Sequence, residues 1–389
     1  MIIVYPVNTT FPSPRANTIQ ILNTANALAE AGIDVHLIAR HKNVPEEEVF
    51  AYYGIRRAER LRMHLTTGSK WFDSARGQES MVLKKTMDVL GQHRKQPKIV
   101  FSRDPLFARI LIHFRRILNL RVVYEAHTLF SETARETYMP IAWSPQKEKR
   151  IRKREQFVFS KADAIVFISA SLREFVQQRI PVRQSSAVVH DGTAVPEAPP
   201  WNAKRPGILC YSGQFYWWKG MSTLMESMRW VEQAVLRMYG GGYSTVHDDM
   251  ALMQKVIEQH ALQNRIEFRG LVPPSKIPEA LAECSIGVLP LPKNVIANHC
   301  NSPLKLFDYM AQGLAVVSSD LLTVREIIEH GRNGHLVSPD DPKALADGIN
   351  RLLQDDAYRK SLAQTAFETV HRYTWTERGR LLTDFLHSL

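Results

Sequence analysis

Short apolar runs rich in β-branched residues recur along the first half of the chain, and a helical pattern follows most of them. Strands this uniformly apolar are buried on both faces, as in a parallel sheet. The clearest helix is predicted at residues 17–32, where apolar residues recur at helical spacing from Ile19 to Ala29 and Gly32 stands at the C′ position. The strands predicted in this half are IIVYPV (2–7), DVHLIA (34–39), KIVFS (98–102), RVVYEA (121–126), AIVFIS (164–169) and AVVHDG (187–192).

The same alternation restarts after residues 193–206, a stretch with four prolines and no periodicity that we interpret as a linker. The strands predicted beyond it are GILCYSG (207–213), VLRMYGGG (235–242), RIEFRG (265–270), IGVLPL (286–291), LAVVSS (314–319) and HLVSP (335–339). This pattern predicts two Rossmann-like, doubly wound α/β domains, at 1–195 and 196–375, with an amphipathic helix at 376–389. Ligands bind at the carboxyl ends of strands in such sheets, so we expect an active site in a cleft between the domains.

Composition excludes several classes of protein. The chain has 389 residues, of which 44% are hydrophobic and 23% are charged, so it can bury large cores and is not disordered. No apolar run approaches the roughly 18 residues that a transmembrane helix needs. The N-terminus lacks the basic region of a secretory signal, and three cysteines without metal-ligand spacing give neither a disulfide framework nor a zinc site. We therefore expect a cytoplasmic protein.

The positive charge is concentrated in one half. Residues 1–195 hold 30 Lys and Arg against 18 Asp and Glu, whereas residues 196–389 hold 20 against 21. The densest runs lie at 146–156 and 113–121. Each run taken alone is typical of a solvated helix face, but the asymmetry predicts an anionic partner for the first half, such as an anionic membrane surface or a phosphorylated lipid-linked substrate. No nucleic-acid-binding motif is present, so nucleic acid ranks lowest.

The sharpest local motif is NSPLKLFDYMAQG (301–313). Ser302 followed by Pro303 predicts a helix start, with a capping hydroxyl and a proline at the first helical position. Lys305 in the first turn suits a diphosphate at the helix N-terminus, and Asp308 one turn later could accept hydrogen bonds from ribose hydroxyls. An ordinary capped helix with a Lys305–Asp308 pair explains the same residues, and the local sequence leaves both interpretations open.

Three further stretches could contribute chemistry. YSGQFYWWKG (211–220) places Lys219 in a loop after a strand, where it could neutralise a leaving phosphate, although the two tryptophans beside it are typical of packing. YGGG (239–242), with Gly241, allows close approach of a ligand but is not a dinucleotide-binding GxGxxG motif. His127 follows a predicted strand end, where a structural histidine and a catalytic one are both plausible.

Taken together, these stretches resemble the retaining GT-B glycosyltransferases of family 4. The resemblance rests on ADAIVFIS, the HDG before the linker, the SG…KG stretch, IEFRGLVPPSKIPEALAECSIGVLPL and SPLKLFDYMAQGLAVVSSD, which follow the family's order over nearly the whole chain. It implies an N-terminal domain that binds the acceptor and a C-terminal domain that binds a nucleotide-sugar. It also implies that the terminal helix packs back on the first domain.

The resemblance assigns roles to individual residues. Lys219 would bind the donor diphosphate, Asp308 stands where the family has a Glu that holds the ribose, and His127 matches the active-site histidine near the transferred sugar. The amides of Pro303 to Lys305 would face the pyrophosphate. The implied catalytic residues are His127, Lys219 and Asp308. The implied donor-binding residues are Gly213, Gln214, Lys219, Gly241, Ser302, Pro303, Leu304, Lys305 and Asp308.

The sequence departs from the family pattern at three places. Cys300 stands where the family often has a Glu that contacts the donor sugar, with His299 and Asn301 as candidate substitutes. Gln214 replaces an Arg in the diphosphate loop. The N-terminal glycine-rich loop reads PSPRAN, which leaves Arg15 as its only cation. The candidate substrate-binding residues are thus Arg15, His299, Cys300 and Asn301.

The sequence therefore predicts a retaining glycosyltransferase that moves a sugar from a nucleotide-diphosphate donor to a glycan or lipid-linked acceptor, in cell-surface polysaccharide or lipopolysaccharide synthesis. A UDP-sugar is favoured by the resemblance alone. Lys219, Lys305 and the helix amides would stabilise the leaving group, so no metal and no other cofactor are expected. Two alternatives stay open: a GT-B nucleotide-sugar epimerase or phosphorylase, and a non-catalytic protein that binds nucleotides or polyanions.

Overall fold

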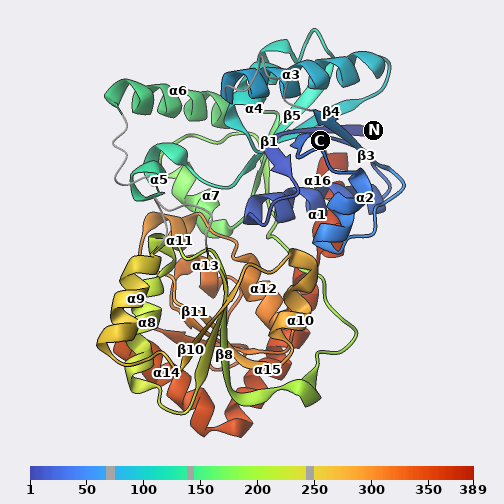
Figure 1. Cartoon of the computed structure of the whole chain (residues 1–389). Helices are drawn as coiled ribbons and strands as arrows, with labels where there is room; N and C mark the ends of the chain where they lie inside the picture. Colours follow the sequence, from blue (N-terminus) through green and yellow to red (C-terminus); the bar gives the residue numbers. More distant parts are fainter. Residues whose placement is uncertain (67–74, 138–143, 242–248) are drawn as a thin grey trace. The chain divides into compact units, whose positions relative to one another are not determined.

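The computed structural model describes residues 1–66, 75–137, 144–241 and 249–389. These residues form two compact units (Figure 1). The first comprises residues 1–132, 143–191 and 375–389, and the second comprises residues 133–142 and 192–374. Each unit is built on a parallel sheet covered by helices, which confirms the predicted fold class.

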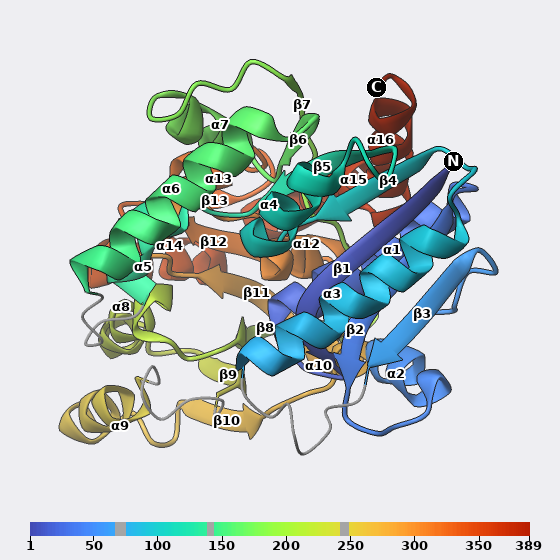
Figure 2. The ribbon, with the colours of Figure 1, turned by 90° about the horizontal axis from the view of Figure 1, so that it is seen from above.

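The first unit has a seven-stranded parallel sheet in the order β3-β2-β1-β4-β5-β6-β7, which can be followed in Figure 2. Its strands are β1 (Ile2–Phe11), β2 (Asp34–His41), β3 (Leu61–Thr66), β4 (Lys98–Ser102), β5 (Leu120–Ala126), β6 (Ala164–Phe167) and β7 (Ser185–Val188). Its helices are α1 (Ala16–Glu30), α2 (Glu46–Tyr53), α3 (Ala75–Gln92), α4 (Pro105–Phe114), α6 (Pro145–Lys161), α7 (Ala170–Gln177) and α16 (Trp375–His387), and α5 (Phe130–Thr137) starts here and continues into the second unit.

The central strands of this sheet form where the sequence predicts them, because their residues are buried on both faces. Helix α1 ends as predicted: its cap is Ala31, and Gly32 follows with a φ of +93°. Strand β3 was not predicted. It lies at the sheet edge with only Leu61 fully buried, so its sequence alternates and lacks the apolar run that marks an inner strand.

The second unit has a six-stranded parallel sheet in the order β10-β9-β8-β11-β12-β13. Its strands are β8 (Arg205–Gly213), β9 (Val235–Gly240), β10 (Ile266–Gly270), β11 (Cys284–Leu289), β12 (Ala315–Ser319) and β13 (His335–Val337). Its helices are α8 (Met221–Ser227), α9 (Met250–Gln259), α10 (Ile277–Leu281), α11 (Val295–His299), α12 (Leu304–Ala311), α13 (Leu322–Arg325), α14 (Pro342–Gln354) and α15 (Asp356–Val370). Short 3-10 turns lie at Trp201–Ala203, Trp217–Lys219, Met228–Trp230, Pro274–Lys276 and His371–Tyr373.

The strand order of the second sheet indicates where it can bind a ligand. From β8 the chain adds β9 and β10 on one side and then β11 to β13 on the other, so the order of strands reverses between the neighbours β8 and β11. In open parallel sheets the crevice at such a reversal, outside the carboxyl ends of the strands, is the usual ligand site. The loop after β8 contains Lys219, and the segment after β11 leads to α12 with Lys305 and Asp308.

Candidate active site

The two segments at the strand reversal of the second unit lie directly against each other. Gly220, next to Lys219, has a φ of +76°, and a Cβ atom there would lie 1.6 Å from the carbonyl oxygen of Pro290. Only glycine permits this approach. The loop after β8 is therefore fixed against the segment that follows β11, and Lys219 is held close to the start of α12.

Lys305 occupies a narrow space beside β8. Its Nζ donates a hydrogen bond of 2.7 Å to the hydroxyl of Tyr211 and lies 4.0 Å from the centre of that ring. A Cβ atom on Gly213 would lie 2.9 Å from the same Nζ, in a backbone with a φ of +132°. Gly213, which the sequence predicts to bind the donor, thus leaves room for the ammonium group of Lys305 because it has no side chain.

The two lysines form no ion pair with a carboxylate among the residues that the structure describes. Burial lowers the pKa of Lys219 to about 8. Burial, together with the positive charge of Lys219, lowers the pKa of Lys305 well below its usual value, and Asp308 opposes that shift. Two neighbouring lysines withdrawn from water, with one carboxylate acting on them only at a distance, are suited to bind an anion.

Asp308 is held by a side chain that the sequence did not indicate. Its Oδ1 accepts a hydrogen bond of 2.7 Å from the hydroxyl of Thr193. Burial raises the pKa of Asp308 to about 6, against the opposing effects of Thr193 and Lys305. Lys305 and Asp308 do not form the ion pair that an ordinary helix would allow among the described residues. Lys305 instead donates a hydrogen bond to Tyr211, and Asp308 accepts one from Thr193.

The prediction for the start of α12 was wrong in detail. The helix begins at Leu304, so Pro303 is its N-cap instead of its first helical residue, and no side chain caps it. Ser302 is buried before the cap, and the carbonyl of Pro303 accepts from the N–H of Leu306 at 2.9 Å. Pro303 has no N–H, so it cannot donate to a pyrophosphate. The free amides of the first turn are those of Leu304 and Lys305, and Leu304 is only half-buried.

The predicted glycine-rich loop is explained by contacts within the second unit. A Cβ atom on Gly240 would lie 1.7 Å from the carbonyl oxygen of Gly213, and one on Gly241 would lie 2.8 Å from the ring of Phe215. Gly241 therefore packs the ends of β8 and β9 together. Gly242 lies outside the described residues. Trp218 is buried and stacks on Tyr216 with ring centroids 4.5 Å apart, which fits the packing role.

Two buried side-chain groups near these segments lack a hydrogen-bond partner in the described chain: the Oε1 of Gln214 and the Nδ2 of Asn301. Buried polar groups are rarely left unpaired, so each is a candidate contact for a bound molecule. Cys300, between His299 and Asn301, is buried and ends α11 with a backbone hydrogen bond to Ile296 at 2.9 Å. Its short side chain cannot replace a carboxylate.

The first unit holds the remaining candidates, Arg15 and His127. His127 follows β5, and its Nε2 lies 2.9 Å from an oxygen of Glu125. Burial, helped by the charge of Arg103, lowers the pKa of His127, while Glu125 opposes that shift. Arg15 is the exposed N-cap of α1. Both residues follow the carboxyl ends of parallel strands, β5 and β1.

Comparison with known sequences identifies the family of each half. Residues 18–195 match the family described as Glycosyltransferase Family 4, and residues 206–355 match the one described as Glycosyl transferases group 1. Together the two matches cover most of the chain, in the order of a two-domain enzyme. The chain is a GT-B glycosyltransferase.

The relatives of this glycosyltransferase that align with nearly the whole chain are distant. D-inositol 3-phosphate glycosyltransferase of Corynebacterium urealyticum is 22% identical, over 95% of this chain and 90% of the relative. Sucrose-phosphate synthase from Thermosynechococcus elongatus has the same fold, with a TM-score of 0.77 at 18% identity, over 100% of this chain and 99% of the other. Anabaena HepE in complex with UDP-glucose aligns over 100% of both chains, with a TM-score of 0.72 at 16% identity.

Sequence reasoning missed four residues of this glycosyltransferase that hold the candidates in place. Tyr211 contacts Lys305, and Thr193 contacts Asp308. Glu125 contacts His127, and Arg378 contacts Glu125. Glu125 could have been found, because a lone acid in an otherwise apolar inner strand is buried and needs a partner. Nothing in the local sequence distinguishes Tyr211, Thr193 or Arg378 from ordinary packing residues.

Proposed function

We propose that this glycosyltransferase transfers a sugar from a nucleotide-diphosphate donor bound in the second unit. The observation that supports the proposal is the pair of buried ammonium groups, Lys219 and Lys305, which form no ion pair among the described residues. The free amides at the start of α12 add partial positive charge beside them. A diphosphate supplies the charge that these groups lack.

Asp308 is placed to bind the sugar of the nucleoside. It lies one helical turn from Lys305, and one of its oxygens is occupied by Thr193, which leaves the other to accept from ribose hydroxyls. We favour UDP as the nucleotide because the structurally similar Anabaena HepE was solved with UDP-glucose. The acceptor that we propose is a glycan or a lipid-linked glycan of the cell surface. The Corynebacterium relative's name, which specifies an inositol phosphate, supports an acceptor that carries phosphate.

The proposed reaction breaks the bond between the anomeric carbon and the diphosphate oxygen and forms one to an acceptor hydroxyl oxygen. The acceptor's proton passes to the departing diphosphate. Because negative charge grows on the diphosphate as the bond breaks, Lys219 and Lys305 stabilise the transition state more than the bound donor. We propose that these groups act in place of a metal ion, and that the anomeric configuration is retained.

The test is a donor screen with a matched pair of variants. Purified protein is incubated with UDP-, GDP- and ADP-sugars and glycan acceptors, and release of the nucleoside diphosphate is measured. We expect one nucleotide class to react, and Lys219→Ala to lower kcat by at least about a hundredfold. Lys276→Ala removes an exposed lysine of the same unit that pairs with Glu279, and should leave the rate unchanged. Equal rates in wild type and Lys219→Ala would contradict the role of Lys219, and an inverted product would contradict retention.

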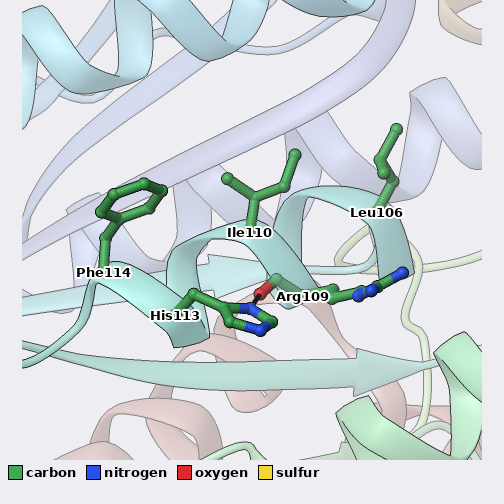
Figure 3. Close-up of a pocket in the computed structure, with 5 residues that line it drawn as sticks. All are labelled: Leu106, Arg109, Ile110, His113 and Phe114. Atoms are coloured by element: carbon green, nitrogen blue, oxygen red, sulfur yellow. Dashed lines mark hydrogen bonds between the residues drawn. The ribbon is translucent and has the colours of Figure 1, made fainter.

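The first unit also presents a surface suited to an anionic membrane. Figure 3 shows Leu106, Ile110 and Phe114 projecting from one side of α4, with Arg109 and His113 on the other. Phe114 is exposed, and so is Ile117 in the following turn, at 81%. Helix α6, which packs on α4, carries the dense basic run at 147–154. None of the helices in the described ranges is long and apolar enough to span a bilayer.

Exposed apolar residues flanked by cations are typical of segments that lie at a membrane interface. We propose that this surface docks the first unit on an anionic bilayer that holds a lipid-linked acceptor. Co-sedimentation with vesicles tests it. We expect phosphatidylcholine vesicles to bind more protein when phosphatidylglycerol is added, with the difference lost at high salt and reduced in Phe114→Ser. Equal binding to neutral and anionic vesicles would contradict the proposal.

A further inference from the structure

Glu125 is the centre of a buried network of hydrogen bonds in the first unit. It is fully buried at β5, and both of its oxygens are occupied. Oε1 accepts from Gln20 at 3.1 Å and from the guanidinium of Arg378. Oε2 accepts from the hydroxyl of Tyr5 at 3.2 Å and lies 2.9 Å from Nε2 of His127. Although burial acts to raise it, the pKa of Glu125 is held below its ordinary value by His127 and Arg378, so the carboxylate is ionised.

Arg378 reaches Glu125 from the far end of the chain. It lies in α16, 253 positions after Glu125, and its side chain is buried. Three more donors of its guanidinium are used, on the hydroxyl of Thr24 (2.9 Å) and the carbonyls of Val189 and His190 (2.7 Å each). The next residue, Gly379, allows the close packing of α16 on α1, because a Cβ atom there would lie 2.6 Å from the carbonyl oxygen of Ala27. Arg378 therefore has one defined position.

This arrangement determines which proton His127 carries. An ionised Glu125 can only accept, so Nε2 of His127 must be the nitrogen that bears hydrogen. Neutral histidine has one N–H, so the other nitrogen, Nδ1, is then an acceptor. The structure contains no described group that hydrogen-bonds Nδ1. The charged groups nearest the ring are Glu125, Arg103 and Asp191, of which Arg103 disfavours the imidazolium.

We propose that Arg378 and Glu125 are positioning residues that fix His127 as the neutral Nε2–H tautomer, so that Nδ1 accepts a hydrogen bond from a substrate hydroxyl. The identity of the hydroxyl rests on the proposed function. The tautomer is independent of that function, because it follows from the contacts of Glu125. It gives the C-terminal helix a chemical role, because Arg378 secures the carboxylate that orients His127.

The competing explanation is that the cluster only joins α16 to α1. The two differ in what they predict for the kcat of a folded protein. A purely structural cluster would leave kcat unchanged in a folded Glu125→Gln protein, whatever happens to the ring of His127. A positioning carboxylate raises the pKa of the histidine and selects one tautomer, so Glu125→Gln should lower that pKa and allow both tautomers.

The experiment combines nitrogen-15 NMR of the imidazole with steady-state kinetics on the full chain. We expect wild-type His127 to show the Nε2–H tautomer at neutral pH. Glu125→Gln should lower its pKa and mix the tautomers, and should lower kcat by about tenfold or more with the KM for the donor nearly constant. Arg378→Lys, which keeps the charge, should keep the tautomer and lose less kcat. Arg380→Met is the matched control, since Arg380 lies on the exposed side of the same helix and pairs with Glu377 and Asp384.

A wild-type ring protonated on Nδ1, or a pKa and tautomer unchanged in a folded Glu125→Gln protein, would overturn the proposal. The wild-type spectrum decides the tautomer even if Glu125→Gln does not fold. Failure of the proposed function has a different signature: His127 would show the expected tautomer and response, while no donor is consumed.

Discussion

Binding of a nucleoside diphosphate should weaken as the pH rises through about 8. The pKa of Lys219 is lowered to about 8 because its ammonium group is buried, and the pKa of Lys305 is lowered further. A bound diphosphate stabilises the charged lysines, so the complex holds protons that the free protein at high pH has lost. The protein must then take up protons at these lysines as the ligand binds.

The size of the effect follows from the pKa of Lys219. At about pH 8 this group is half charged, so binding should take up about half a proton on its account, and Lys305 adds to that uptake. About one pH unit higher, only about one-tenth of the free protein carries this charge, so Lys219 alone should make the Kd about fivefold larger, and Lys305 adds a further increase. The phosphate of the ligand is fully ionised in this range, with its second pKa near about 6, so it does not contribute.

The assay is titration calorimetry of UDP in buffers of different ionisation enthalpy, between about pH 7.5 and about pH 9.5. The dependence of the observed enthalpy on the buffer gives the number of protons taken up. Lys219→Met should bind more weakly and lose most of the pH dependence, whereas Lys276→Met should behave as wild type. A Kd that stays constant across this range, without proton uptake, would refute the argument that these two lysines bind the diphosphate.

Three further predictions concern other parts of the chain. Gly213→Ala places a Cβ atom 2.9 Å from Nζ of Lys305 and should weaken UDP binding by about tenfold or more in calorimetry; an unchanged Kd would contradict the placement of Lys305. Ser169→Ala removes the N-cap of α7, whose hydroxyl accepts from Leu172 at 3.2 Å, and should lower the free energy of unfolding by about 1 kcal/mol in urea denaturation, with an unchanged midpoint as the contrary result. Burial, with His64 nearby, lowers the pKa of His36 to about 4. Because the unfolded chain then binds this proton at a higher pH than the folded protein does, the free energy of unfolding should fall as the pH drops from about 6.5 toward 4. His36→Gln should flatten this dependence, and equal acid sensitivity of the two proteins would exclude the histidine as its source.

Most of the fold could be predicted because the inner strands of both sheets are largely buried on two faces and therefore contain short apolar runs. Residues 2–7 of β1, 99–101 of β4 and 122–124 of β5 are such runs. The edge strands lack it: in β3 only Leu61 is fully buried, and no residue of β7 is. A half-exposed strand at an edge forms because it pairs with a neighbouring strand of the sheet, and the local sequence gives no information about that neighbour.

The candidate site was predicted in part, because its lysines and Asp308 lie in local motifs. Their partners could not be found in the same way. Tyr211 is 94 positions from Lys305, and Thr193 is 115 positions from Asp308, so these contacts exist only after the second sheet has formed. The helix cap was mistaken for a related reason: Ser302 has the right residue type for a cap, but folding buries it and starts the helix at Leu304.

The most direct test of the account is calorimetric binding of UDP, GDP and ADP to the wild type and to Asp308→Ala, with Asp347→Ala, an exposed aspartate of the second unit, as the control. The account predicts that one nucleotide binds to the wild type and to the control, and that its affinity falls by about tenfold or more in Asp308→Ala as the ribose contact is lost. Failure of all three to bind the wild type, or equal binding to Asp308→Ala, would contradict a nucleotide site at the start of α12.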